Sequence, residues 1–183
     1  MKERIPLKPI ELKLISELMK NSRRSDRELA KAIGTSQPTV SRTIKKLEKE
    51  GIVKEYTMIP DFAKLGYELM STIFIRTKNV AKPDEVEAIR DAAAEEVNKN
   101  VFPDLFMERG LGLGFDGMII TLHRRYSDYI EQVNYTKSRP FVQPDRVESF
   151  LVDLKNPVHY RRLTLSVVVN DLIKRSEEQK KGN

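Results

Sequence analysis

The chain contains no cysteine and no tryptophan, and only two histidines among its 183 residues. Without cysteine there is no disulfide framework and no thiolate metal site. His123 and His159 cannot build a zinc site without help from carboxylates. No apolar run approaches the roughly 18 residues that a membrane span requires, and no apolar stretch of signal-peptide length follows the charged start. We therefore expect a cytoplasmic protein with no cofactor, no metal site and no membrane contact.

Positive charge is concentrated in the first third of the chain. Residues 1–60 hold 14 of the 33 basic residues and 8 of the 27 acidic ones, which accounts for the whole net charge of +6. The remaining 19 basic and 19 acidic residues cancel. This asymmetry is typical of a nucleic-acid-binding module joined to a neutral one. The alternative is a basic surface that is merely solvated.

Two capped helices separated by a tight turn dominate the first sixty residues. A first amphipathic helix is expected over about 9–20. Ser25 and Glu28 match a capping box that opens a second, short helix, and Gly34 ends it because glycine tolerates the left-handed conformation. Ser36 is a natural N-cap for a third helix that runs to about residue 50. The pair of helices predicts a helix-turn-helix.

The third helix is predicted to turn an apolar face to the core and a basic face outward. In a helix-turn-helix this helix enters the major groove, where Gln37 can pair with adenine and Arg42 with guanine. Basic side chains around it neutralise phosphates. The segment 52–59 is β-rich and predicts the strand of a wing. The expected DNA-binding residues are Arg23, Arg24, Ser25, Ser36, Gln37, Pro38, Thr39, Ser41, Arg42, Lys45, Lys46 and Lys54.

Residues 25–30, 33–42, Ile44 and 47–53, continued by 56–61 and 64–67, resemble the leucine-responsive regulator (Lrp/AsnC) family. The resemblance is specific over about residues 10–75 and looser beyond. It implies DNA-binding dimers that often assemble further. It also implies a second domain of βαββαβ order that oligomerises and senses amino acids or related metabolites.

Periodicity predicts the same order for the rest of the chain, an α+β fold with a ferredoxin-like second domain. Strands are expected at 69–77, 105–107, 118–122 and 147–154. One helix opens at 82–85, with Val86, Ile89, Ala93 and Val97 on one face, and another runs from Ser127 to about Thr136. A long loop is expected over 137–146. The expected domains are a winged helix-turn-helix (1–60), a hinge (61–68), a ligand-sensing and oligomerisation domain (69–154) and a C-terminal extension (155–183).

In the C-terminal extension, Leu165, Val168, Val169, Leu172 and Ile173 form one helical stripe. The β-branched run 167–169 makes a strand the competing assignment. We expect a helix that packs on its own domain or on a partner subunit.

A glycine-rich stretch at 110–117 contains a G-x-G-x-x-G string. A dinucleotide loop requires a helix after it, whereas the residues that follow predict a strand, so this reading is rejected. A flexible hairpin is one alternative. The resemblance implies that a glycine and an aspartate here hold an effector between subunits, with Asp116 receiving an ammonium group and backbone N–H groups a carboxylate. The expected effector-binding residues are Gly112, Gly114, Phe115, Asp116 and Gly117.

The favoured function is a sequence-specific, double-stranded-DNA-binding transcription regulator, dimeric or larger and not an enzyme. Two alternatives stay open. Siroheme decarboxylases resemble the same two-domain build, and His123, Arg124 and Arg125 could serve such an enzyme. An architectural protein would coat DNA with little sequence preference, but the base-reading groups of the third helix favour specificity.

Overall fold

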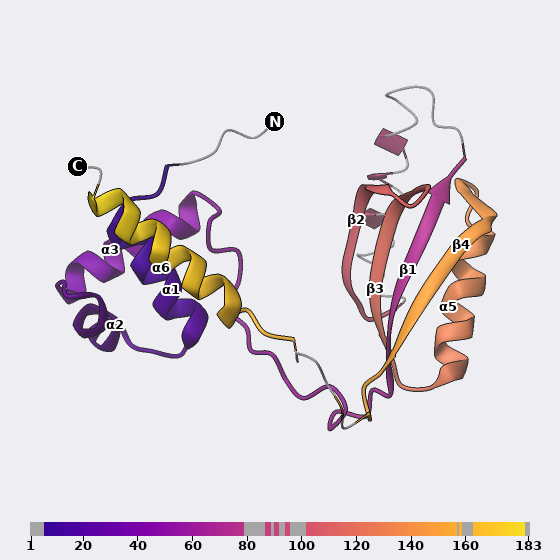
Figure 1. The fold of residues 1–183 in the computed structure, drawn as a ribbon, viewed down its shortest axis with the longest axis horizontal. Coiled ribbons are helices and arrows are strands. Elements are labelled where there is room, and N and C mark those ends of the chain that lie inside the picture. The colour runs from indigo at the N-terminus through magenta and orange to yellow at the C-terminus, as the bar shows by residue number, and fades with distance from the viewer. Residues whose placement is uncertain are drawn as a thin grey trace. The chain divides into compact units, whose positions relative to one another are not determined.

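The computed structural model describes residues 6–78, 87–88, 90–91, 94–95, 102–156, 158 and 163–181. The chain divides into two compact units, shown in Figure 1. The first unit joins Met1–Ile59 to Tyr160–Asn183, and the second is Pro60–His159. Residues 160–183 of the C-terminal extension therefore belong to the N-terminal unit. The domain limits expected at 60, 68 and 154 remain predictions.

The first unit is helical. It consists of α1 (Pro9–Lys20), α2 (Asp26–Ile33), α3 (Gln37–Lys49) and α6 (Ser166–Lys181). The first helix and the helix-turn-helix are confirmed within a residue or two, the usual uncertainty of helix ends. One buried apolar cluster holds α1, α2 and α3 together, formed by Leu14, Leu18, Leu29, Ala30, Val40 and Leu47.

The wing strand expected over residues 52–59 is not formed. Ile52 and Val53 pack against the helical cluster, but the next six side chains are exposed. A strand requires a neighbouring strand that accepts and donates its backbone hydrogen bonds, and no described segment pairs with this one. High β propensity alone does not supply that neighbour.

The C-terminal helix α6 packs against α1 and lies beside it in Figure 1. Val169 and Leu172 are 2% and 8% exposed, and Ser176 Oγ donates a hydrogen bond to the carbonyl oxygen of Pro9 at 3.0 Å. The 167–169 run is helical because the helical stripe buries Val169 and Leu172, which a strand's alternation would not do. The expected helix is confirmed, and its partner is the first helix of the chain, but Leu165 and Val168 of the expected stripe are exposed.

The second unit is built on an antiparallel sheet of order β2-β3-β1-β4. Its strands are β1 (Leu69–Thr77), β2 (Asp104–Gly112), β3 (Phe115–His123) and β4 (Val142–Asp153), and α5 (Tyr126–Ser138) packs on β4, β1 and β3. The helix expected to open at 82–85, with Val86, Ile89, Ala93 and Val97 on one face, falls on residues outside the described part of the chain.

The long loop expected over residues 137–146 is wrong, because β4 already begins at Val142. The register between β1 and β4 shifts between the pairs Ile75–Val147 and Thr77–Val142. This irregularity leaves extra residues on β4, and such bulges tolerate a proline that cannot donate a ladder hydrogen bond. Pro144 lies in that stretch, so it marks a bulge within a strand.

Candidate DNA-binding surface and ligand cavity

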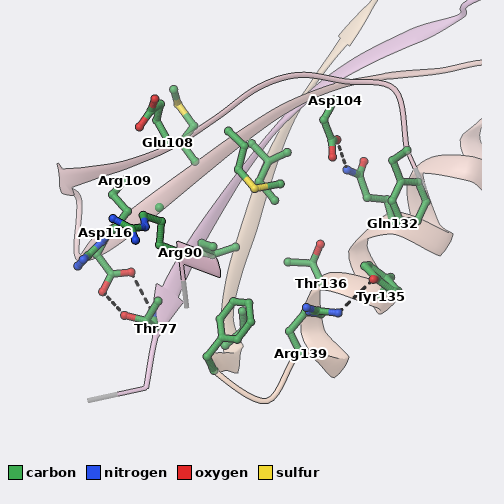
Figure 2. Close-up of a pocket in the computed structure, with 18 of the residues that line it drawn as sticks. Thr77, Arg90, Asp104, Glu108, Arg109, Asp116, Gln132, Tyr135, Thr136 and Arg139 are labelled. Atoms are coloured by element: carbon green, nitrogen blue, oxygen red, sulfur yellow. Dashed lines mark hydrogen bonds between the residues drawn. The ribbon is translucent and has the colours of Figure 1, made fainter. Parts of the chain in front are cut away.

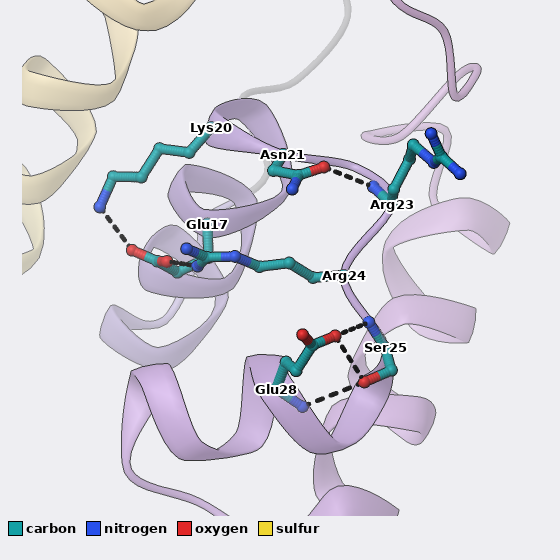
Figure 3. Close-up of polar contacts among 7 residues, drawn as sticks. All are labelled: Glu17, Lys20, Asn21, Arg23, Arg24, Ser25 and Glu28. Atoms are coloured by element: carbon teal, nitrogen blue, oxygen red, sulfur yellow. Dashed lines mark hydrogen bonds and ion pairs between the residues drawn. The ribbon is translucent and has the colours of Figure 1, made fainter.

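Local caps define both ends of α2 and the start of α3. Ser25 Oγ accepts the backbone N–H of Glu28 at 3.3 Å, and the Glu28 carboxylate accepts the N–H of Ser25 at 2.8 Å (Figure 3). Gly34 ends α2 with φ +74°, and its N–H donates to Ala30 O at 3.0 Å. Ser36 Oγ then accepts the N–H of Thr39 at 3.4 Å and opens α3. These bonds satisfy helix-terminal N–H groups that would otherwise lack partners.

The two faces of α3 differ sharply in exposure. Val40 and Leu47 are fully buried in the helical cluster and fix the rotation of the helix. Gln37, Arg42 and Lys45 are exposed on the other side, with Thr39 and Ser41 half-buried beside them. The polar face therefore presents amide, guanidinium, ammonium and hydroxyl groups to whatever approaches α3.

Several of the side chains expected to contact DNA instead bind other residues of the protein. Lys46 Nζ lies 2.5 Å from the Glu11 carboxylate and 3.7 Å from that of Glu50. The Arg24 guanidinium pairs with Glu17, as Figure 3 shows. Ser25 is used in its own cap. The ion pairs of Lys46 and Arg24 depend on α1, which a reading of the helix-turn-helix alone does not include.

Glu11 links α1 to α3 from a buried position, at 3% exposure. Burial alone raises its pKa, but hydrogen bonds from Lys46 Nζ and from the backbone N–H of Lys8, at 2.7 Å, outweigh burial and hold the pKa below its usual value. Glu11 thus stays ionised and links α1 to α3 within the helical unit.

Of the remaining expected contacts, Arg23, Lys54, Ser36 and Pro38 are exposed. The backbone N–H of Arg23 donates to Asn21 Oδ1 at 3.0 Å (Figure 3). Both Arg23 and Lys54 lie on segments that flank the helix pair. Their assignment to DNA stays a prediction.

The glycine-rich stretch is a β-hairpin, and the rejection of a dinucleotide loop is confirmed because β3 follows it. Only Leu113 and Gly114 form the turn, with φ of +53° and +79°. Both angles are positive, as in the two-residue turns that suit the twist of a hairpin. A leucine in this conformation is uncommon, and its side chain is 85% exposed at the tip.

The expected effector residues do not converge on one site. Asp116 accepts hydrogen bonds from Thr77 N at 2.8 Å and Thr77 Oγ1 at 2.6 Å, so its carboxylate is engaged with β1. Phe115 is buried, with the Arg146 guanidinium 5.5 Å from its ring centroid. Asp116 and Gly117 border the cavity described next, whereas Gly112, Gly114 and Phe115 do not.

That cavity, here called the sheet cavity, has a volume of about 430 Å³ and lies wholly within the second unit. Its walls combine apolar side chains of the sheet with residues of α5 and of the 139–142 segment. Figure 2 shows Asp104 and Gln132 close together at one end and Thr77 with Asp116 at the other. Its apolar and aromatic lining includes Ile75, Phe102, Met107, Met118, Ile119, Tyr135, Phe141 and Val142.

Asp104, Thr121 and Gln132, here called the floor triad, were missed by the sequence analysis. Asp104 Oδ1 accepts hydrogen bonds from Thr121 Oγ1 at 2.5 Å and Gln132 Nε2 at 2.8 Å. Burial raises the pKa of Asp104, and these two bonds oppose that rise. Gln132 lies on the inward face of α5 together with Thr136, so the buried positions of this helix are polar and no apolar stripe marked them in the sequence.

His123 has a structural role. It is 2% exposed, its Nε2 lies 2.8 Å from Ser71 Oγ, and Tyr129 packs edge-on at 5.7 Å. Burial lowers its pKa and favours the neutral imidazole. Among the described residues no three His, Asp or Glu side chains gather as metal ligands, and none of the helices described is long and apolar enough to cross a membrane.

Comparison with known proteins identifies the N-terminal helical unit as a DNA-binding type. Residues 7–54 match the winged helix-turn-helix DNA-binding family. An uncharacterised HTH-type transcriptional regulator of Pyrococcus horikoshii is 35% identical over 103 residues, 56% of this chain and 64% of that protein. A second, from Pyrococcus abyssi, is 31% identical over 98 residues, 49% of this chain and 67% of that protein. LrpC of Bacillus subtilis is 41% identical over 73 residues, 40% of this chain and 51% of that protein. The chain thus spans between about half and two thirds of these relatives' length.

Solved structures share the fold over most of the chain. LrpC of Bacillus subtilis superposes with a TM-score of 0.64 at 24% identity, covering 86% of this chain and all of that one. AsnC of Escherichia coli gives 0.62 at 21% identity, over 87% of this chain and 99% of that one. A transcriptional regulator of Neisseria meningitidis in complex with L-Met gives 0.71 at 23%, over 91% and 99%. With its capped helix pair and ferredoxin-like sheet, the chain belongs to the Lrp/AsnC family of winged helix-turn-helix transcriptional regulators.

Proposed function

We propose that this chain binds specific double-stranded DNA sequences and thereby regulates transcription. One observation carries the proposal: α3 follows a capped turn, is locked to the core by Val40 and Leu47, and exposes Gln37, Arg42 and Lys45. A helix of this kind fits the major groove, where its N-terminal part meets base edges.

The exposed groups divide into two roles. The amide of Gln37 matches adenine and the guanidinium of Arg42 matches guanine, so these two side chains would read sequence. Lys45, Arg23 and Lys54 would contact phosphates and supply affinity that falls with salt. The net charge of +6, which residues 1–60 account for in full, favours DNA as the partner.

The second unit would form a homo-oligomer through its open sheet face. The strand registers place Phe106, Ile120, Thr72 and Phe150 in one row across the four strands. This row faces away from α5, which packs on the side of Thr121. Phe106 and Phe150 are 45% and 67% exposed. A row that exposes large aromatic side chains favours contact with another protein surface. A second copy of this chain offers the same apolar surface for that contact.

The second unit would also bind a small effector, an amino acid or a related metabolite. The regulator of Neisseria meningitidis with the same fold was solved with L-Met. The second unit of this chain has a cavity within the size range of small-molecule sites. DNA binding and effector binding would then be coupled through the oligomer.

The test is binding of the purified protein to DNA from upstream of its own gene and to a random duplex of equal length, across a salt series. A specific regulator prefers its site by roughly a thousandfold or more. Salt-sensitive binding without preference would make the chain an architectural protein. Absence of binding would contradict the proposal, and an absorbance titration with a tetrapyrrole would then test the enzyme alternative.

A further inference from the structure

We propose that the sheet cavity binds a small organic cation, with a primary ammonium group at Asp104 and Gln132 and an apolar body along the sheet. The binding site stands on the geometry of the second unit alone. Such a ligand would also alter DNA affinity as the effector, and this role rests on the proposed function. Neither the glycine hairpin nor the oligomer interface is needed for the binding site.

The floor triad leaves one acceptor unused. Gln132 is 1% exposed, and its Nε2 donates to both Asp104 Oδ1 and Thr121 Oγ1 at 2.8 Å. Its Oε1 is buried and has no hydrogen-bond partner among the described residues. A buried acceptor without a donor costs free energy, and native structures retain few of them. A ligand that donates a hydrogen bond at this point removes the cost.

Asp104 has no ion-pair partner among the described residues, although Arg90, Arg109 and Arg139 also line the cavity. It receives its hydrogen bonds from the neutral groups of Thr121 and Gln132. A buried carboxylate is stabilised most by an opposite charge within hydrogen-bond distance. An ammonium group supplies that charge to Asp104 and an N–H to Gln132 Oε1. An anion placed against Asp104 is repelled by that carboxylate, and a neutral hydroxyl supplies only the hydrogen bond.

The walls define the rest of the ligand. Beyond the floor triad the cavity is bordered by aliphatic, thioether and aromatic groups, among them Met107, Ile119 and Tyr135. Charged side chains border it as well, namely Arg90, Glu108, Arg109, Asp116 and Arg139. About 430 Å³ accommodates a compact organic molecule, within the range of small-molecule pockets. Burial of an aliphatic or aromatic body in this space contributes favourable free energy.

The carboxylate at the opposite end does not compete for the ammonium group. Asp116 already accepts two hydrogen bonds from Thr77, and Arg76 Nη1 lies 3.9 Å from it. Its charge and its acceptor sites are therefore met within the protein. This places the cation at Asp104 rather than at the aspartate of the hairpin.

The test compares amines with alcohols of the same shape. n-Butylamine, n-hexylamine and 2-phenylethylamine are titrated into the full chain by calorimetry, each against 1-butanol, 1-hexanol or 2-phenylethanol. We expect at least one amine to bind at least tenfold more tightly than its alcohol. L-Phenylalanine, which adds a carboxylate to 2-phenylethylamine, distinguishes amino acids from simple amines as the source of the ammonium group.

Variants locate the site. Asp104→Asn should lose most of the preference for the amine, and Gln132→Leu part of it. Asp145→Asn, the same change at an exposed position outside the cavity, should keep it. Equal affinity for amine and alcohol, no binding of any amine, or unchanged binding by Asp104→Asn overturns the proposal. The comparison of amine with alcohol in the unaltered chain needs no variant to fold.

DNA binding separates this proposal from the proposed function. If amines bind as expected but the chain binds no DNA, the proposed function fails and the cavity assignment stands. If DNA binds with sequence preference but no amine binds, the cavity assignment fails and the regulator stands.

Discussion

Replacing Leu172 by alanine should destabilise the first unit although the residue lies 123 positions beyond the end of α3 in the sequence. Leu172 is 8% exposed on α6, which packs on α1. Truncation of a buried leucine to alanine costs about 2–5 kcal/mol of unfolding free energy, least where the site can collapse. Because α6 is a single surface helix that can readjust, we expect about 2–3 kcal/mol.

Val168→Ala is the matched control, one turn earlier on the same helix and 43% exposed. We expect a loss within about 0.5 kcal/mol there, as for surface substitutions in general. Ser176→Ala lies between the two, because it removes only the hydrogen bond to Pro9 O, worth about 1 kcal/mol.

Amide hydrogen exchange of α1 in each variant is the suitable assay, because two units need not unfold in one transition. Leu172→Ala should speed the exchange of α1 and leave the sheet unchanged. Equal protection of α1 in Leu172→Ala and Val168→Ala would refute the packing of α6 on α1.

Three further predictions concern single contacts. Glu11→Gln should cost roughly 1 kcal/mol at neutral pH. Because the folded pKa of Glu11 is lowered, its contribution is present above the ordinary value of 4.5 and lost as the pH falls through the folded pKa, so denaturation curves of variant and parent should converge in acid. Gly117→Ala should cost about 1–3 kcal/mol of unfolding free energy, since a Cβ would lie 2.6 Å from Ile75 Cγ1. Gly110→Ala is the control, because a Cβ there meets no atom within 4 Å. Equal changes in the thermal unfolding temperature of the two variants would contradict this prediction. Ser25→Ala should cost about 1 kcal/mol by loss of the cap, and unchanged exchange in α2 would argue against it.

Local chemistry made the helical unit predictable from sequence. The helices are capped by hydrogen bonds between residues only three or four positions apart in the sequence, at Ser25, Glu28, Gly34 and Ser36. The sequence pattern therefore predicts the structure found. The hydrophobic stripe of α3 gave its buried face for the same reason. The inner strands β1 and β3 were equally clear, because their apolar runs are buried.

Pairing over long sequence distances was not predictable. Lys46 was predicted to contact a DNA phosphate, but in the structure it pairs with Glu11, 35 residues away in the sequence. The segment 52–59 has the composition of a strand but no described neighbour. The segment 137–146 was expected to be a loop, whereas β4 begins at Val142 and contains Pro144 at a shifted register with β1. The floor triad joins three separate elements, which no local pattern reveals.

The central claim is that the exposed face of α3 binds DNA, and the salt dependence of binding tests it most directly. The double variant Arg42→Ala/Lys45→Ala is compared with Lys78→Ala/Lys137→Ala, which removes the same charge from exposed positions of the second unit. If both α3 side chains contact phosphates, the slope of log affinity against log salt should fall by about 1.8 for the first variant and not for the second. If Arg42 contacts a base instead, the slope should fall by about 0.9 and the preference for the specific site should drop as well. Equal slopes and equal affinities in both variants would contradict the assignment of α3 to DNA.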